Sequence, residues 1–314
     1  MYLKKIVRFI KNIMDMVRVY ASTECKDIIP VWTQAQEESK FSYINKNFFP
    51  KIIWMYWDDE KDIPSIVKLC RDVIEKKCPE YEVRFLNSSS VVNYIDVPIV
   101  KLGLPTAVFA DLIRLRLLKK YGGIWFDASI FLVQDIDWIL SKIDRYDAFL
   151  FYSDQCTIDI QSPIPENWFI IAPIKSVFIT DWLDEFEKCI FSNVPTSYYN
   201  DLKNDPAFIQ GLTRPDYLLC YISAMVVLKN KKYNILYSSS GSTGHYFTYK
   251  YNFNGYKIAC DMLFKNADRI ERTTLIKFTS GTRRIIEFLL KNNIYSKRSL
   301  IGAAYHENKN DKLI

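Results

Sequence analysis

The 314-residue sequence has few of the residues on which several common kinds of site depend. Its two histidines, His245 and His306, exclude a multi-histidine metal centre. Its seven cysteines are scattered, odd in number and form no C-x-x-C pair. This argues against a disulfide framework or a zinc site and favours reduced thiols in a cytosolic protein. Catalysis is therefore expected to rest on carboxylates, hydroxyls and backbone groups.

Long apolar runs are also lacking. No stretch reaches the roughly 18 to 20 residues that span a bilayer, and no signal peptide is recognisable. The hydrophobic content of 49%, with 15% aromatic residues, excludes general disorder. Because no internal repeat or Pro/Gly-rich linker divides the chain, we predict one main domain over residues 23–290. An N-terminal helix over 1–22 and a basic C-terminal tail over 291–314 complete the predicted organisation.

Residues 1–22 have a basic amphipathic pattern. Apolar side chains fall on one helical face and basic side chains take up much of the remainder, the two sets being Ile6, Phe9, Ile10, Ile13 and Val17, and Lys4, Lys5, Arg8, Lys11 and Arg18. This pattern suits a helix lying in an anionic membrane surface, and equally one packed on its own domain or on a second subunit. The net charge of +6 is mild and no recognisable module accompanies it, so nucleic-acid binding is not expected.

Short apolar runs alternate with helical patterns along the rest of the chain. The predicted strands cover residues 51–57, 81–86, 124–126, 147–153 and 167–173, and the predicted helices cover 64–77, 108 to the Gly122-Gly123 pair, 176–191 and 215–230. Such alternation indicates an α/β sandwich around a mostly parallel or mixed sheet. Ligands of these sheets sit beyond the carboxyl ends of the strands, which is where Asp58, Asp59 and Asp127 fall.

The stretch VFADLIRLRLLKKYGGIWFDAS, residues 108–129, is the best candidate for a site. A helix stopped by Gly122-Gly123 is followed by a short strand that carries Asp127 at its carboxyl end. Within the helix, Asp111 and Arg114 are three residues apart and share one face. A charged pair on an apolar helix needs partners, so the two form a structural salt bridge or reach sugar hydroxyls or a phosphate in a cleft. The alternative for Asp127 is an ordinary surface acid after an ordinary strand.

Residues 110–130 closely resemble the signature of bacterial capsular polysaccharide synthesis glycosyltransferases. That pattern runs Ser-Asp-x-x-Arg-x-x-x-Leu-x-x-Tyr-Gly-Gly-x-Trp-x-Asp-Ala-Thr and is akin to those of yeast-type mannosyltransferases and glucosylating clostridial toxins. Weaker likeness extends over residues 50–281, and the length suits capsular α-galactosyltransferases of the WciN type. The resemblance implies a GT-A fold, a Rossmann-like mixed sheet flanked by helices.

The resemblance also implies an activity. It points to a retaining transferase that moves a hexose, galactose before glucose, from a UDP-sugar to a lipid-linked, undecaprenyl-type capsule precursor. Such an enzyme would be cytoplasmic and peripheral on the inner face of the cell membrane. The alternatives are a UDP-sugar-binding protein without turnover and a toxin-like protein glucosyltransferase.

By the same resemblance, specific residues receive roles. Asp111 and Arg114 would hold the donor sugar, Asp127 would be the first acid of the Asp-x-Asp motif, and Asp216 would be the acid on the far side of the sugar. The other implied donor contacts are Ile53 and Trp54 at the uracil, Gly123 at close backbone approach, Asn167, and Lys277 and Ser280 at the diphosphate. Taken alone, Lys277 is more typical of a surface lysine, and Asp216 is equally a helix N-cap or first-turn acid after Pro215.

Three positions depart from the family pattern. The serine before the first acid is Ala110, the second acid of Asp-x-Asp is Ser129, and the proline after Thr-Gly is His245. The implied metal, Mn²⁺ or Mg²⁺, would then be held by Asp127, Ser129 and His245. A lone histidine in a Gly-Ser-Thr loop is otherwise a surface residue.

Overall fold

A computed structural model describes residues 2–23, 25–35, 48–97 and 105–311. Its main feature is a seven-stranded sheet in the order β1-β8-β6-β7-β4-β2-β3. The sheet strands are β1 (Trp32–Ala35), β2 (Ile52–Tyr56), β3 (Glu82–Leu86), β4 (Gly123–Phe126), β6 (Ala148–Tyr152), β7 (Pro165–Ala172) and β8 (Ile235–Ser239). A separate two-stranded ribbon joins β5 (Ile130–Leu132) to β9 (Leu275–Lys277) in antiparallel fashion.

The sheet is mixed. Strand β2 runs parallel to β3 and β4, and β6 runs parallel to β8, whereas β7 is antiparallel to both of its neighbours and β1 is antiparallel to β8. The predicted fold class, a mixed sheet flanked by helices, is confirmed. The chain segments that follow β2 and β4 therefore emerge at one edge, beside the beginning of the antiparallel β7.

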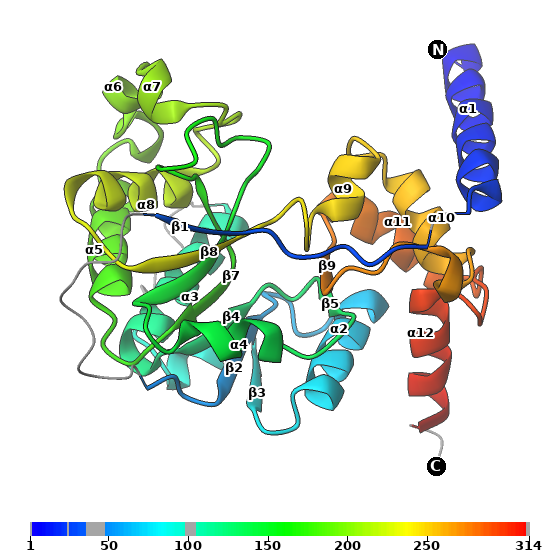
Figure 1. Ribbon diagram of the computed structural model, residues 1–314, viewed down its shortest axis with the longest axis horizontal. Coiled ribbons are helices and arrows are strands. Elements are labelled where there is room, and N and C mark those ends of the chain that lie inside the picture. The colour runs from blue at the N-terminus through cyan, green and yellow to red at the C-terminus, as the bar shows by residue number, and fades with distance from the viewer. Residues whose placement is uncertain (1, 24, 36–47, 98–104, 312–314) are drawn as a thin grey trace.

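Helices cover both faces of the sheet (Figure 1). On one face, α3 (Thr106–Tyr121), α5 (Val177–Ile190) and α8 (Leu219–Asn230) share a core with Trp54 and Trp125. On the other face, α2 (Ser65–Lys77) and α4 (Asp137–Ile143) pack against alternate residues of the same strands. Because successive strand residues point to opposite faces, a strand covered on both sides is buried along its whole length, as β6 and β7 are. Strand β6 is apolar throughout, whereas β7 carries the polar Glu166 and Asn167 near its start.

The shorter elements lie between these. They are the 3₁₀ turns η1 (Val91–Asn93), η2 (Pro195–Ser197) and η3 (Ala267–Arg269), and the helices α6 (Asn200–Lys203), α7 (Pro206–Ile209) and α9 (Tyr246–Lys250). Helix α8 begins four residues later than the pattern from 215 predicted. Arg214 has φ of 62°, and residues 215–218 form turns before the helix starts.

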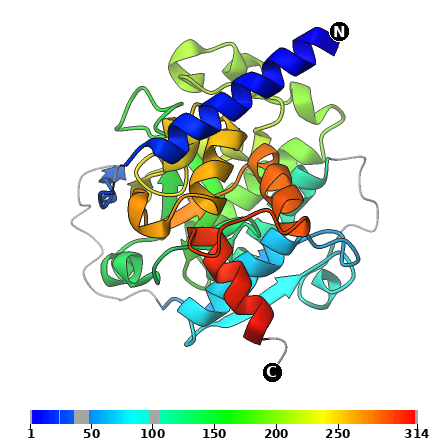
Figure 2. The same cartoon turned by 90° about the vertical axis from the view of Figure 1, so that its right-hand side faces the viewer.

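A helical group stands beside the sheet and carries both ends of the described chain (Figures 1 and 2). It contains α10 (Gly255–Leu263), α11 (Ser280–Lys291), α12 (Leu300–Asp311) and the N-terminal α1 (Tyr2–Ala21). Residues 291–314, expected as a basic tail, thus include a helix whose Ile301 is fully buried. None of the described helices combines the length and the apolar character needed to cross a membrane.

Among the described side chains of α1, those on one side of the helix contact α10. Val19 is buried, the Cys260 thiol donates to the carbonyl of Met16, and Lys257 lies 3.6 Å from Asp15. The opposite side of α1 is apolar and exposed, through Val7, Ile10, Ile13, Met14, Val17 and Tyr20. Packing on the domain and an outward apolar face are therefore combined in one helix.

Candidate active site

A cavity of about 580 Å³ opens at the edge where β2 and β4 end. Asp127 follows β4, and its backbone N–H donates to the carbonyl of Trp168, which fixes it against the start of β7. Asn167 lies on β7 beside it, and Asp111 and Arg114 face the same cavity from α3. Asp111 and Asn167, which are 56 residues apart in the sequence, therefore meet at the cavity.

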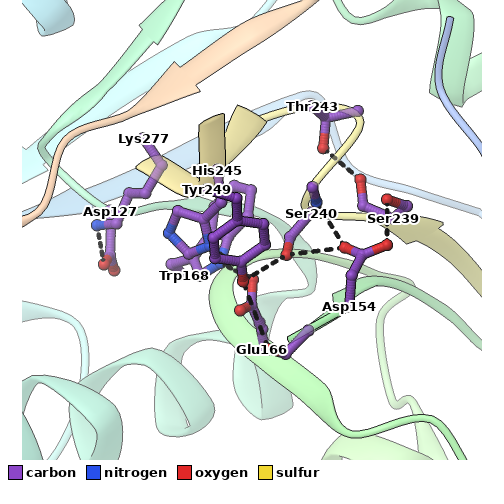
Figure 3. Close-up of polar contacts among 12 residues, drawn as sticks. Asp127, Asp154, Glu166, Trp168, Ser239, Ser240, Thr243, His245, Tyr249 and Lys277 are labelled. Atoms are coloured by element: carbon purple, nitrogen blue, oxygen red, sulfur yellow. Dashed lines mark hydrogen bonds and ion pairs between the residues drawn. The ribbon is translucent and has the colours of Figure 1, made fainter. Parts of the chain in front are cut away.

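Asp127 is the centre of the charged network. Its Oδ1 accepts from Arg114 Nη2 at 2.7 Å and from Trp125 Nε1 at 3.0 Å, and its Oδ2 accepts from Lys277 Nζ at 2.5 Å. Burial favours the neutral acid, but Lys277 and Arg114 outweigh it and hold the pKa of Asp127 below its usual value. Asp127 is thus an ionised carboxylate between two cations, of which Figure 3 shows Lys277.

Asp111 lies on the other side of Arg114. Its Oδ1 is 3.0 Å from Arg114 Nη1 and accepts from Asn167 Nδ2 at 2.9 Å. Burial raises the pKa of Asp111 to about 6, against the lowering effect of Arg114. The side chain therefore changes charge within a pH range that an enzyme assay can reach.

Arg114 is 3% exposed and stands over the Trp125 ring, with 4.9 Å between its guanidinium carbon and the ring centre. Its Nε is buried and makes no hydrogen bond among the residues that the structure describes. The Asp111–Arg114 salt bridge is therefore formed, and the same pair also faces the cavity. The salt-bridge alternative drawn from the sequence is confirmed, and contact of the pair with a sugar or a phosphate stays a prediction.

Lys277 reaches the cavity from the end of β9, which pairs with β5 at Ile130. Besides Asp127, its ammonium donates to Ser129 Oγ at 3.1 Å, and the Ser129 hydroxyl donates to the carbonyl of Phe278. Burial lowers the pKa of Lys277, although Asp127 acts in the other direction. Lys277 is thus an internal lysine of the site, and Ser280 lines the same cavity at the start of α11.

His245 also lines the cavity, within the turn that precedes α9. Its ring lies 5.4 Å from the Trp168 ring and 5.5 Å from that of Tyr249, centre to centre (Figure 3). Its Nδ1 lies 3.4 Å from Glu166 Oε2, and Glu166 also accepts from Trp168 Nε1. His245 is therefore held between aromatic rings and a buried carboxylate.

The predicted metal ligands do not fit together as a metal site. Asp127 already accepts from two cations, and Ser129 is committed to Lys277 and to a backbone carbonyl. Over the part of the chain that the structure describes, no three acidic, histidine or cysteine side chains gather in a metal-binding arrangement.

Other predicted site residues lie outside the cavity. Ile53 and Trp54 are fully buried in the middle of β2, and Trp54 Nε1 donates to the carbonyl of Gly122. They occupy the core because helices cover both faces of that strand. The aromatic residues of this segment that do line the cavity are Tyr56 and Trp57, at and just beyond the end of β2.

Gly123 and Asp216 also have different surroundings from those expected. A Cβ on Gly123, which has φ of 93°, would stand 2.6 Å from the carbonyl oxygen of Ile52, so this glycine admits the neighbouring strand rather than a donor. Asp216 bridges to Lys203 with 72% of its side chain exposed, and the next residue, Tyr217, lines the cavity instead. The late start of α8 accounts for this change of direction.

Several cavity residues were not predicted. Tyr217 and Tyr221 come from the α8 region, and Arg283 comes from the first turns of α11 and stands over the Trp57 ring. A possible signal for Arg283 was the segment Thr279-Ser280, because Thr279 caps α11 by accepting from the N–H of Thr282. That cap makes Arg283 an early residue of a helix that begins at the cavity.

The model of one protein family, described as capsular polysaccharide synthesis protein, matches residues 8–199. The chain belongs to this family. Among curated proteins, no match to the sequence is found. The family match covers most of the strands of the main sheet and the Asp111–Asp127 segment, so the resemblance seen in residues 110–130 is confirmed at the level of the family.

Solved structures of glycosyltransferases have a loose likeness to this family member. One is involved in the glycosylation of the major capsid of PBCV-1, with 6% identity, a TM-score of 0.41 and coverage of 77% of this chain and 98% of the other. GlyE of Streptococcus pneumoniae TIGR4 has 10% identity and a TM-score of 0.39, covering 85% and 64%. The galactosyltransferase LgtC has 12% identity and a TM-score of 0.37, covering 73% and 87%. At these TM-scores no residue role is transferred.

Proposed function

We propose that this member of the capsular polysaccharide synthesis family is a GT-A-type glycosyltransferase that takes a hexose, galactose before glucose, from a UDP-sugar. The observation that carries the proposal is the cavity in which Asp111, Arg114, Asp127 and Lys277 form one charged network. Its volume of about 580 Å³ lies within the ~300–1,000 Å³ typical of small-ligand sites. In capsule synthesis, a transferase of this kind would act on a lipid-linked precursor.

The residues suit the two halves of such a donor. Carboxylates and amides hydrogen-bond sugar hydroxyls, and Asp111 and Asn167 present both groups to the cavity. Ammonium and guanidinium groups bind phosphate oxygens, and Lys277 and Arg114 supply them. The negative charge of the departing UDP would thus develop beside fixed cations, which is where a transferase stabilises its transition state. We propose retention of the anomeric configuration, as the signature implies.

The test is incubation with a panel of UDP-sugars and short sugar acceptors, with released UDP and transferred sugar both measured. We expect one UDP-hexose to be turned over. Arg114→Ala should lower turnover per folded molecule by about a hundredfold or more, as for loss of a positioned transition-state donor. Arg116→Ala is the matched control, since Arg116 lies on the same helix but pairs with Glu187 away from the cavity.

The outcomes separate the candidates. Binding of a UDP-sugar without release of UDP would support the non-catalytic alternative. If Arg114→Ala unfolds the protein while its folded fraction stays fully active, the Asp111–Arg114 pair has only a structural role.

We further propose that the protein sits on an anionic membrane surface through α1. Support comes from the exposed apolar side of that helix together with Arg18, whose side chain is 74% exposed. A position on the membrane would bring the enzyme to a lipid-linked acceptor.

A further inference from the structure

We infer that this enzyme carries the diphosphate of its donor on protein cations, with Arg283 as a diphosphate-binding residue, and needs no divalent metal there. The inference rests on the proposed function. It is carried by two observations: both oxygens of Asp127 are already bound by cations, and Arg283 faces the cavity without an acidic partner.

The first observation concerns the place where a metal would be expected. Arg114 and Lys277 each contribute a full positive charge within hydrogen-bonding distance of Asp127. A divalent ion on the same carboxylate would stand beside both cations in a partly buried site, where like charges repel strongly. Ser129, in the position of the second acid, adds no negative charge and accepts from Lys277. The local chemistry suits an anion rather than a further cation.

The second observation is Arg283. Its guanidinium carbon lies 4.7 Å from the centre of the Trp57 ring, and both side chains line the cavity. Within the described ranges, no carboxylate comes within ion-pair distance of it. Burial lowers the pKa of Arg283, with Asp127 acting against this, so the group loses hydration without gaining a partner. A half-buried guanidinium of this kind is prepared for an anionic ligand.

Two other acids of the cavity wall, Asp58 and Asp59, do not form an ion pair with Arg283. Asp58 Oδ1 accepts from the Tyr56 hydroxyl at 2.6 Å, and Asp59 Oδ1 accepts from the backbone N–H of Lys61. Asp59 is exposed. Arg283 and Lys277 therefore remain the cations available to phosphate oxygens on the α11 side of the cavity.

These positions define what the cations do in the reaction. The bond between the anomeric carbon and the β-phosphate oxygen breaks, and its electron pair stays on that oxygen. The acceptor hydroxyl oxygen bonds the anomeric carbon, and its proton passes to the departing diphosphate. A planar guanidinium can bind two phosphate oxygens at once, and Lys277 adds a point charge, so the added negative charge is met by fixed donors.

The experiment is calorimetric titration of UDP and of uridine into the wild-type protein, in chelator and then in Mn²⁺. In chelator we expect UDP to bind at least about tenfold tighter than uridine, and Mn²⁺ to change the Kd for UDP by less than about threefold. Arg283→Ala should raise the Kd for UDP by about 10- to 100-fold, the range for one or two charge-assisted hydrogen bonds, and leave that for uridine nearly unchanged.

Arg284→Ala is the matched control, since Arg284 is the adjacent residue of α11 and is exposed. It should bind UDP as the wild type does. Retained uridine binding by Arg283→Ala shows that this variant is folded, and Arg283→Lys should recover part of the affinity for UDP.

Tight UDP binding only in the presence of Mn²⁺ would overturn the inference, as would equal effects of the two alanine variants. Failure of UDP to bind under both conditions would remove the proposed function together with the inference. UDP binding in chelator with no turnover of any UDP-sugar would support the diphosphate site and reject the transferase activity, so the two failures are distinguishable.

Discussion

At the scale of single residues, the site depends on how each carboxylate is balanced. Asp127 has two cationic partners and a lowered pKa, whereas Asp111 shares Arg114 and has a raised one. The same arginine therefore contacts one acid whose pKa is lowered and one acid whose pKa is raised to about 6. The spacing of three residues predicted that Asp111 and Arg114 would pair. It did not predict that the pKa values of Asp111 and Asp127 shift in opposite directions.

We predict that Asp111 gives the reaction a pH dependence. Its ionised form is the one that accepts from Asn167 and pairs with Arg114, so kcat/KM for the donor should rise with pH and level off above about 6. Asp111→Asn should lower activity and lose this inflection. A pH profile of kcat/KM for both proteins checks this, and an inflection unchanged in Asp111→Asn would assign it to another group.

The same shift has a consequence for stability. The pKa of Asp111 is raised from 3.8 in the unfolded chain to about 6 in the folded protein. Its contribution to stability is therefore fully present below pH 3.8 and is lost as the pH rises toward 6. Relative to Asp111→Asn, the wild type should lose stability across that window.

At the scale of elements, the glycine pair between α3 and β4 works through the sheet. Gly122 and Gly123 both have positive φ, and a Cβ on either would collide with backbone atoms of neighbouring segments. The sequence correctly indicated the helix end and the strand start there. It could not show that the close neighbours are β2 and the end of β7, because those contacts arise only when the sheet assembles.

We predict that Gly123→Ala destabilises the fold by roughly 1–3 kcal/mol or more, since it combines a strained φ with a contact to the Ile52 carbonyl. Gly281→Ala is the control, because its Cβ would meet nothing within 4 Å and it lies in α11. That variant should be as stable as the wild type or slightly more so. Urea unfolding measures both. Equal stability of the two variants would contradict the packing explanation.

At the scale of the whole molecule, the N-terminal α1 forms a body beside the sheet together with α10, α11 and α12 (Figure 1). The outward side of α1 is where a membrane would be met. Val17 on α1 is 61% exposed and Val177 at the start of α5 is 55% exposed, and the two helices lie on opposite sides of the molecule in Figure 1. Val17 and Val177 therefore serve as a test position and a control position for the same substitution.

We predict that Val17→Glu weakens binding to vesicles containing anionic lipid by about tenfold, because it puts a charge in the apolar face. Val177→Glu makes the same change in charge and should bind as the wild type does. Co-sedimentation with anionic and with neutral vesicles measures this. Equal binding by the two variants would reject the membrane role of α1, and a change in molecular mass by light scattering would indicate a subunit contact instead.

The sequence by itself determined the local elements and the family. Periods of two and of three to four residues located β2, α2, β3, α3 and α5 to within a few residues, and the Asp111–Asp127 spacing carried the family signature. These features depend on neighbours in the chain. Which side chains near the end of an element face the cavity does not depend on neighbours in the chain. For this reason Trp54 was predicted at the donor, whereas Tyr56 and Trp57 line the cavity. In the same way Asp216 was predicted there, whereas Tyr217 lines it. Only the tertiary structure brought Lys277 to Asp127 and Arg283 to Trp57, because ion pairs and ring contacts across 150 or more residues form when strands and helices from distant segments meet at one sheet edge.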